Sequence, residues 1–344
     1  VERGHPFIFP RAWTYGVAEA KPVEKTMSLH PLQILLLEKI PPRLRHLLLP
    51  VFEAAGDRVQ EIRICQDKPI LVQTAAGELY VSPAGPTDRL EEAVIADAGT
   101  VKELLDAVTS SSVYALQDAM KEGYVPLPGG HRVGLCGEAR TEGGRVAGFR
   151  HVTGFNIRLN RDLSGVARPV LRRLVRPDGG IWSTLVVSPP GAGKTTLLRD
   201  LIRTLSRGAP EYGLKPQRVG VADERGELAG AFRGVAQNDL GPRADVIDRC
   251  PKRFALAMLV RTMSPDVVVT DEIGHPEDAE AALDAVTAGV ALVCSAHGAT
   301  LADVKRRPSL RPLLEHEVFQ RVVVLSKREG PGTVERVVPC GGAA

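Results

Sequence analysis

A short segment at residues 188–196 has the residue types and the spacing of a phosphate-binding loop. The general pattern is G-x-x-x-x-G-K-[ST], placed after a strand and before a helix. Gly193, Lys194 and Thr195 match this pattern, whereas Ser188 stands where the first glycine is usual. We expect the whole segment to contact a nucleotide, through Ser188, Pro189, Pro190, Gly191, Ala192, Gly193, Lys194, Thr195 and Thr196.

The chemistry expected of this loop is specific. Backbone N–H groups at the start of the following helix would face the β-phosphate. Lys194 would place a positive charge near the β- and γ-phosphate oxygens, and the Thr195 hydroxyl would bind Mg²⁺. Residues 184–187 predict a buried strand before the loop, and 197–205 predict an amphipathic helix after it. This setting favours an ATP and Mg²⁺ site over a chance glycine-rich turn.

A second polar pair follows the apolar run 267–270, which is typical of a buried strand. Such a strand delivers Asp271 and Glu272 at its carboxyl end, where ligands bind in open α/β sheets. Asp271 would hold the magnesium through water or through Thr195, and Glu272 would orient and deprotonate the attacking water. The alternative is that these two residues only cap the next helix.

Two further strand ends carry candidate residues. Asp223 and Glu224 follow the run 218–222, and we interpret them as part of the same magnesium and phosphate site. Glu224 is then the second candidate for the catalytic carboxylate, although a solvated turn would explain the pair as well. His297 follows the run 291–295 and could contact the γ-phosphate, although a lone histidine is more often structural.

The elements that must position these residues form two groups. Five short runs rich in β-branched residues alternate with helical patterns after residue 166, which predicts a mostly parallel sheet covered on both faces. Residues 27–165 predict a smaller α+β domain with two short helices, a strand at 59–64, a hairpin around Gly77, and helices at 95–108 and 113–122. Residues 1–26 lack any helical or alternating period and are expected to be a disordered extension.

Composition narrows the possible functions. The 44 basic and 41 acidic side chains nearly balance, which disfavours nucleic-acid binding by charge alone. No apolar run reaches the roughly 18 residues that span a bilayer. The five cysteines stand singly without a CxxC pair, as expected of reduced thiols rather than zinc ligands or disulfides.

The order of the four motifs resembles that of the type II/type IV secretion ATPase superfamily. The chain is still more similar to the stage III sporulation protein AA family, in segments 127–139 (LPGGHRVGLCGEA), 188–201 (SPPGAGKTTLLRDL), 221–252, 260–265 (VRTMSP) and 296–300 (AHGAT). This resemblance runs from about residue 27 to the end of the chain. It also favours the phosphate-contacting role for His297.

The resemblance implies a cytoplasmic, RecA-like ATPase that forms a ring, expected to be hexameric. It further implies a role in the mother cell of an endospore-forming bacterium, where the protein would drive a secretion-like channel toward the forespore. A small membrane protein like stage III sporulation protein AB is the implied docking partner, which would make the protein peripheral to the membrane. Two features depart from the superfamily: Asp271 precedes Glu272 where glycine is common, and the cysteine-rich zinc insert of some pilus ATPases is missing.

Two competing functions stay open at this point. A RecA-like NTPase acting on single-stranded nucleic acid would need a basic groove with aromatic platforms, and aromatic residues are only 4% of this chain. A nucleotide-gated scaffold with little turnover is disfavoured by Glu272. In a ring, an arginine from one subunit could reach the neighbour's phosphates. The candidates for this role are the arginines of 241–249 together with Arg140, Arg150, Arg158, Arg225, Arg233 and Arg261.

Overall fold

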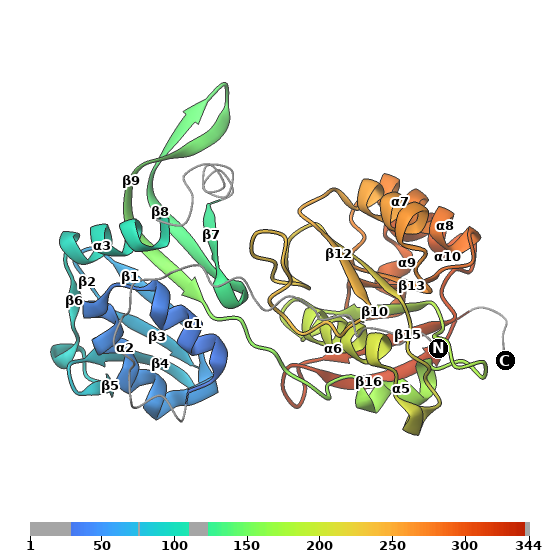
Figure 1. Cartoon of the computed structure of the whole chain (residues 1–344), viewed down its shortest axis with the longest axis horizontal. Coiled ribbons are helices and arrows are strands. Elements are labelled where there is room, and N and C mark those ends of the chain that lie inside the picture. Colours follow the sequence, from blue (N-terminus) through green and yellow to red (C-terminus); the bar gives the residue numbers. More distant parts are fainter. Residues whose placement is uncertain (1–28, 75, 110–122, 341–344) are drawn as a thin grey trace, which may run out of the picture.

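The computed structural model describes residues 29–74, 76–109 and 123–340. It contains two separate seven-stranded sheets, one before and one after an extended segment that follows residue 158 (Figure 1). The extension predicted at 1–26 and the helix predicted at 113–122 lie outside the described residues. Within the described residues, no helix is both long enough and apolar enough to cross a bilayer.

The N-terminal sheet is antiparallel throughout, with strand order β5-β4-β3-β1-β9-β8-β7. Among the described residues, three helices pack against it, and four leucines of the two predicted short helices are buried in this core: Leu36, Leu37, Leu44 and Leu48. The helices are α1 (Pro31–Lys39), α2 (Pro42–Ala55) and α3 (Ala98–Thr109). The strands are β1 (Val59–Cys65), β3 (Leu71–Thr74), β4 (Gly77–Ser82), β5 (Gly85–Thr87), β7 (Tyr124–Leu127), β8 (His131–Glu142) and β9 (Arg145–Arg158), with a small separate pair β2 (Lys68–Pro69) and β6 (Ile95–Ala96).

The strand predicted at 59–64 and the hairpin at Gly77 are confirmed. The helix predicted at 95–108 begins too early, because Ile95 and Ala96 form β6 instead. The reason is Asp97, whose carboxylate accepts hydrogen bonds from the Thr100 N–H at 2.7 Å and from its hydroxyl at 2.7 Å. This is the contact of a helix N-cap, so the helix starts after Asp97.

The C-terminal sheet has the order β12-β11-β13-β14-β10-β15-β16 and is parallel except for its last strand. All five predicted strands are present, and two more join the edges. The sheet is formed by β10 (Thr184–Ser188), β11 (Val219–Asp223), β12 (Ala244–Asp248), β13 (Val267–Glu272), β14 (Ala291–His297), β15 (Arg321–Ser326) and β16 (Thr333–Pro339). The helices are α5 (Arg168–Leu174), α6 (Lys194–Arg207), α7 (Lys252–Met263), α8 (Pro276–Thr287), α9 (Leu301–Lys305) and α10 (Arg311–Glu315).

Both faces of this sheet are buried, which is why its strands are continuously apolar. Val186 and Val269 pack on the side of α5 and α6, whereas Val187 and Val268 pack on the side of α7, α8 and α10. Successive residues of one strand therefore serve two different cores. Helices on both faces of a parallel sheet leave only the strand ends free for polar chemistry.

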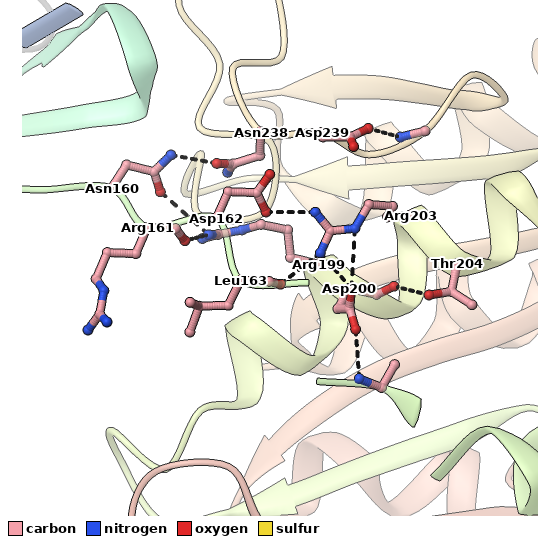
Figure 2. Close-up of polar contacts among 12 residues, drawn as sticks. Asn160, Arg161, Asp162, Leu163, Arg199, Asp200, Arg203, Thr204, Asn238 and Asp239 are labelled. Carbon is pink, nitrogen blue, oxygen red and sulfur yellow. Dashed lines mark hydrogen bonds and ion pairs between the residues drawn. The ribbon is translucent and has the colours of Figure 1, made fainter. Parts of the chain in front are cut away.

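The segment between the two sheets is held by the helix that follows the predicted phosphate-binding loop (Figure 2). Arg199 donates to the Arg161 carbonyl at 2.7 Å, and Arg203 donates to Asp162 at 2.9 Å and to the Leu163 carbonyl at 2.7 Å. Asp200 accepts from Arg203 on the same helix and from the Ala167 N–H. The linker thus lies along α6 and is fixed by buried charged groups.

Candidate functional site

The loop 189–193 connects the buried strand β10 to α6, as the sequence predicts. Gly193 adopts φ 90° immediately before the helix, and a Cβ there would lie 3.0 Å from the Gly332 nitrogen. The positive φ and the close backbone both require glycine at this position. The Gly332 N–H donates to the Ala192 carbonyl at 3.0 Å, so the β15–β16 hairpin supports the loop from outside.

The polar residues of three neighbouring strands meet beside this loop. Strands β13, β14 and β10 are adjacent and parallel, and Ser188 is in register with His297. On the other side of β14, Glu272 is paired with Ser295 after a register shift. Carboxyl ends of adjacent parallel strands lie at the same sheet edge, which is why residues far apart in sequence converge here.

Lys194 is buried at the centre of this edge, with 8% of its surface exposed. Its ammonium lies 3.3 Å from both the Ser188 carbonyl and the Ser188 hydroxyl, and 2.8 Å from His297 Nδ1. Burial lowers the pKa of Lys194, and the charge of Glu272 works against that shift. The lysine is therefore a desolvated cation that lies at the start of α6, where a phosphate is expected to bind.

His297 connects this lysine to Glu272. An ammonium group only donates, so His297 Nδ1 must accept and its proton must lie on Nε2. Nε2 is 3.0 Å from Glu272 Oε2, and Arg307 binds the other carboxylate oxygen at 2.9 Å. Lys194, His297, Glu272 and Arg307 thus form one continuous chain of contacts.

A second group of charges surrounds Asp271. The buried ammonium of Lys252 lies 2.7 Å from Asp271 Oδ1 and 2.6 Å from Glu224 Oε2. Burial raises the pKa of Asp271 to about 6, although Lys252 favours its charged form. Lys252 therefore joins the carboxylates predicted from two different strands.

Asp223 is not available to a metal in the way that the sequence suggested. Its carboxylate accepts hydrogen bonds from the backbone N–H groups of Glu227, Leu228 and Ala229, at 2.8 to 3.1 Å. Burial raises the pKa of Asp223, and these three donors oppose the shift. The residue shapes the turn after β11, and Glu224 beside it is committed to Lys252.

A cavity of about 430 Å³ lies at this edge and is lined by Gly191, Gly193, Lys194, Thr195, Thr196, Arg225, Glu227, Asp271, Glu272, Ser295, His297 and Pro331. It brings together the predicted loop with Asp271, Glu272 and His297. Among the arginine candidates, Arg225 lines the cavity, whereas Arg140, Arg150 and Arg158 pair with glutamates on the N-terminal sheet.

Sequence reasoning missed Lys252, Arg307 and Glu227. Lys252 begins a helix with a basic residue, which usually indicates an exposed position, but it is buried against Glu224 and Asp271. Arg307 stands in a basic run without any motif. Glu227 lies in the conspicuous segment 221–252, which could have directed attention to it. Its carboxylate is 3.6 Å from Arg132 of the N-terminal sheet.

The donor set at the cavity fits a magnesium ion bound together with phosphates. Thr195 offers a hydroxyl and Asp271 a carboxylate, which are the hard oxygen ligands that Mg²⁺ prefers. No group of three or more His, Cys, Asp or Glu residues in the described chain could hold a metal by itself. A magnesium ion here would need phosphate and water oxygens to complete its shell.

Comparison with known proteins adds a family to this geometry. A family model for sporulation stage III, protein AA, matches residues 33–343. The chain is 40% identical over 303 residues to stage III sporulation protein AA of Bacillus subtilis strain 168, covering 88% of this chain and 94% of that protein. The chain belongs to the stage III sporulation protein AA family.

The chain also shares sequence with a plant protein. Protein SEEDLING PLASTID DEVELOPMENT 1 of Arabidopsis thaliana is 32% identical over 206 residues, which is 55% of this chain and 28% of the plant protein. The shared region is therefore a limited part of that longer protein.

Solved structures confirm the predicted fold class. The pilus retraction motor PilT with bound ADP aligns with a TM-score of 0.54 at 16% identity, over 86% of this chain and 84% of that one. The ATPase DotB of Yersinia pseudotuberculosis aligns with a TM-score of 0.52 at 14% identity, over 94% and 83%. The chain thus has the α/β fold of PilT and DotB, with a RecA-like, mostly parallel C-terminal sheet preceded by a smaller α+β unit.

Proposed function

We propose that the protein is a Mg²⁺-dependent ATPase that hydrolyses ATP at the cavity beside β10, β13 and β14. The observation that carries the proposal is the contact chain from Lys194 through His297 to Glu272. It joins a phosphate-binding lysine to a carboxylate in the same 430 Å³ cavity. A chance glycine-rich turn would have no reason to place these groups in contact.

Binding of ATP would use the loop and the start of α6. N–H groups of residues 193–196 would receive the β-phosphate, and Lys194 would exchange its contact with His297 or Ser188 for phosphate oxygens. Thr195 and Asp271 would hold magnesium, which supplies charge neutralisation of the β- and γ-phosphates. The N-terminal pole of the α6 dipole would add to the attraction.

Hydrolysis would follow from the release of His297. Once Lys194 turns to phosphate, His297 Nδ1 is released, and Nδ1 would need to carry a proton to donate to a γ-phosphate oxygen while Nε2 keeps Glu272 in place. Glu272 would then orient a water and accept its proton. We assign this role to Glu272 rather than Glu224, because Glu272 lines the cavity beside Lys194, whereas Glu224 is not among the residues that line it.

The family and the fold together support a motor role in sporulation. PilT is a pilus retraction motor, and DotB is an ATPase. By analogy, we propose a homo-oligomeric, hexameric ring in the cytoplasm, peripheral to a membrane complex between mother cell and forespore. A small membrane protein like stage III sporulation protein AB would be its partner.

The experiment is a steady-state ATPase assay of the full chain with Mg²⁺. Glu272→Gln keeps the size and the hydrogen-bonding oxygen of the side chain but removes the base, so turnover should fall about 100-fold or more while ATP affinity stays within a few-fold. Glu280→Gln, which changes an exposed carboxylate on α8, is the matched control and should retain wild-type turnover. Equal turnover in the Glu272→Gln variant and the wild type would refute the assignment.

The same assay tests the alternative that the protein acts on single-stranded nucleic acid. Adding single-stranded DNA should leave turnover unchanged if the protein is a secretion-type motor. Strong stimulation by DNA would contradict that role and favour the alternative.

A further inference from the structure

A second cavity, of about 400 Å³, lies on the segment that follows β14. It is formed by α9, the short helical turn η5 (Pro308–Leu310) and α10. Its wall includes Lys305, Arg306, Arg307, Arg311, Leu314 and Glu315, and we call it the basic cleft. Four basic side chains thus face one carboxylate around a concave surface.

Two of these cations form no salt bridge among the described residues, although the charge of Arg306 also acts on the Asp303 carboxylate. Arg311 is paired with Glu315 at 2.7 Å, and Arg307 is paired with Glu272 at 2.9 Å. Lys305 and Arg306 are exposed and form no salt bridge with any residue at 29–74, 76–109 or 123–340. Basic residues outnumber acidic ones in the wall of the cleft, and this excess of positive charge favours an anionic partner.

Arg307 belongs to both cavities at once. It lines the basic cleft, and its guanidinium also contacts Glu272, the carboxylate that we assign as the base. Glu272 Oε2 is occupied by His297 at 3.0 Å, so Arg307 engages the remaining oxygen. A carboxylate held at both oxygens by donors is restrained as a proton acceptor. Any anion that draws Arg307 into the cleft would relieve this restraint.

We propose that the basic cleft binds an acidic polypeptide segment, and that this binding draws Arg307 away from Glu272 and accelerates ATP hydrolysis. The proposed peptide binding is argued from the residues of the cleft alone. The proposed acceleration of ATP hydrolysis rests, in addition, on the proposed function. Leu314 and Pro308 line the cleft beside the cations, and this mixed wall suits a peptide with both carboxylate and aliphatic side chains.

The binding test uses a fluorescein-labelled peptide of about ten alternating Glu and Leu residues, followed by fluorescence anisotropy with the full chain. The double variant Lys305→Glu/Arg306→Glu reverses two exposed charges of the cleft and should weaken binding at least about 10-fold. Arg172→Glu/Arg173→Glu makes the same charge change at exposed positions of α5 and should stay within about twofold of wild type. Equal affinity of both double variants, or no saturable binding by the wild type, would overturn the proposal.

Three further probes test the chemical class of the partner. A peptide of alternating Lys and Leu residues should fail to compete with the labelled peptide. Inorganic phosphate should fail to compete as well. Vesicles of phosphatidylglycerol should bind no more tightly to the wild type than to the Lys305→Glu/Arg306→Glu variant. Preferential vesicle binding through these two residues, without peptide binding, would assign the cleft to a membrane and contradict our proposal.

The regulatory step has its own readout. The Glu-Leu peptide should raise wild-type kcat several-fold, and Arg307→Gln should raise kcat without peptide and abolish the response. A lowered kcat in Arg307→Gln, or an unchanged response to peptide, would overturn the regulation. If the wild type binds the peptide but hydrolyses no ATP under any condition, the proposed function fails while the binding site stands.

Discussion

The two sheets of this protein differ in where their charged side chains lie. In the antiparallel N-terminal sheet, charged residues pair with neighbours on the surface, as Arg158 does with Glu61 and Arg150 with Glu138. In the parallel C-terminal sheet, Lys194, Asp271 and His297 come from different strand ends and meet in one cavity. Strand direction explains the difference, because only parallel strands present all their carboxyl ends at the same edge.

Removing a charge should therefore cost most where the parallel sheet concentrates charges. Lys252→Met leaves the carboxylates of Asp271 and Glu224 without their shared cation, which should lower the free energy of unfolding by about 3 kcal/mol. Arg253→Met is the neighbouring control, and its exposed pair with Glu277 should contribute no more than about 0.5 kcal/mol. Urea unfolding measures both. Similar losses of unfolding free energy in the two variants would contradict the difference that we infer between buried and exposed ion pairs.

The second largest loss of stability should come from the linker between the two sheets. Arg203 is buried and binds Asp200, Asp162 and the Leu163 carbonyl, so Arg203→Met should destabilise the chain by about 2 kcal/mol. It should also speed tryptic cleavage at linker residue Arg161, because the linker loses its attachment to α6. Arg207→Met removes an exposed pair with Asp239 one turn further along α6 and should leave the cleavage rate unchanged. Equal cleavage rates would show that Arg203 does not hold the linker.

The smallest effect should come from a titration in the N-terminal sheet. His131 is buried; its Nε2 donates to the Leu32 carbonyl at 2.6 Å and its Nδ1 accepts from the Asn160 N–H at 3.1 Å. Burial lowers the pKa of His131 below its ordinary 6.5. Below pH 6.5 the unfolded chain therefore binds a proton at this histidine that the folded chain does not bind until the pH is lower.

Stability from His131 is therefore fully present above pH 6.5 and is lost as the pH falls toward the lowered folded pKa. The slope is at most about 1.4 kcal/mol per pH unit. Between pH 7.5 and 5.5, His131→Gln should lose less stability than the wild type, whereas His46→Gln, at an exposed histidine, should follow the wild-type curve. Parallel curves for His131→Gln and wild type would contradict a neutral buried histidine.

Prediction from sequence succeeded where local pattern and chemistry coincide. Three strands of the C-terminal sheet have an apolar run that ends in polar residues, and all three occur as expected. They are the strands that lead to the loop before Lys194, to Asp271 and to His297. The edge strands β12 and β16 were missed, because edge strands are half exposed and lack that apolar run.

The partners of the site residues could not be predicted in the same way. Lys252 and Arg307 act through contacts across 19 and 35 positions of sequence, to Asp271 and Glu272. Such contacts depend on strand order and register, which no local pattern specifies. Asp223 was expected at the magnesium and phosphate site and instead caps the turn at 227–229, through contacts only 4, 5 and 6 positions along the chain, so here the prediction missed a local turn.

The most direct test of the account is ATP binding and turnover by the wild type and by Lys194→Ala, measured by calorimetry and by phosphate release with Mg²⁺. We predict that Lys194→Ala stays folded, as judged by circular dichroism, but loses about 100-fold or more in turnover, because the phosphates lose their buried cation. Lys215→Ala, at an exposed lysine, should behave as wild type. Normal ATP hydrolysis by a folded Lys194→Ala protein would contradict the site.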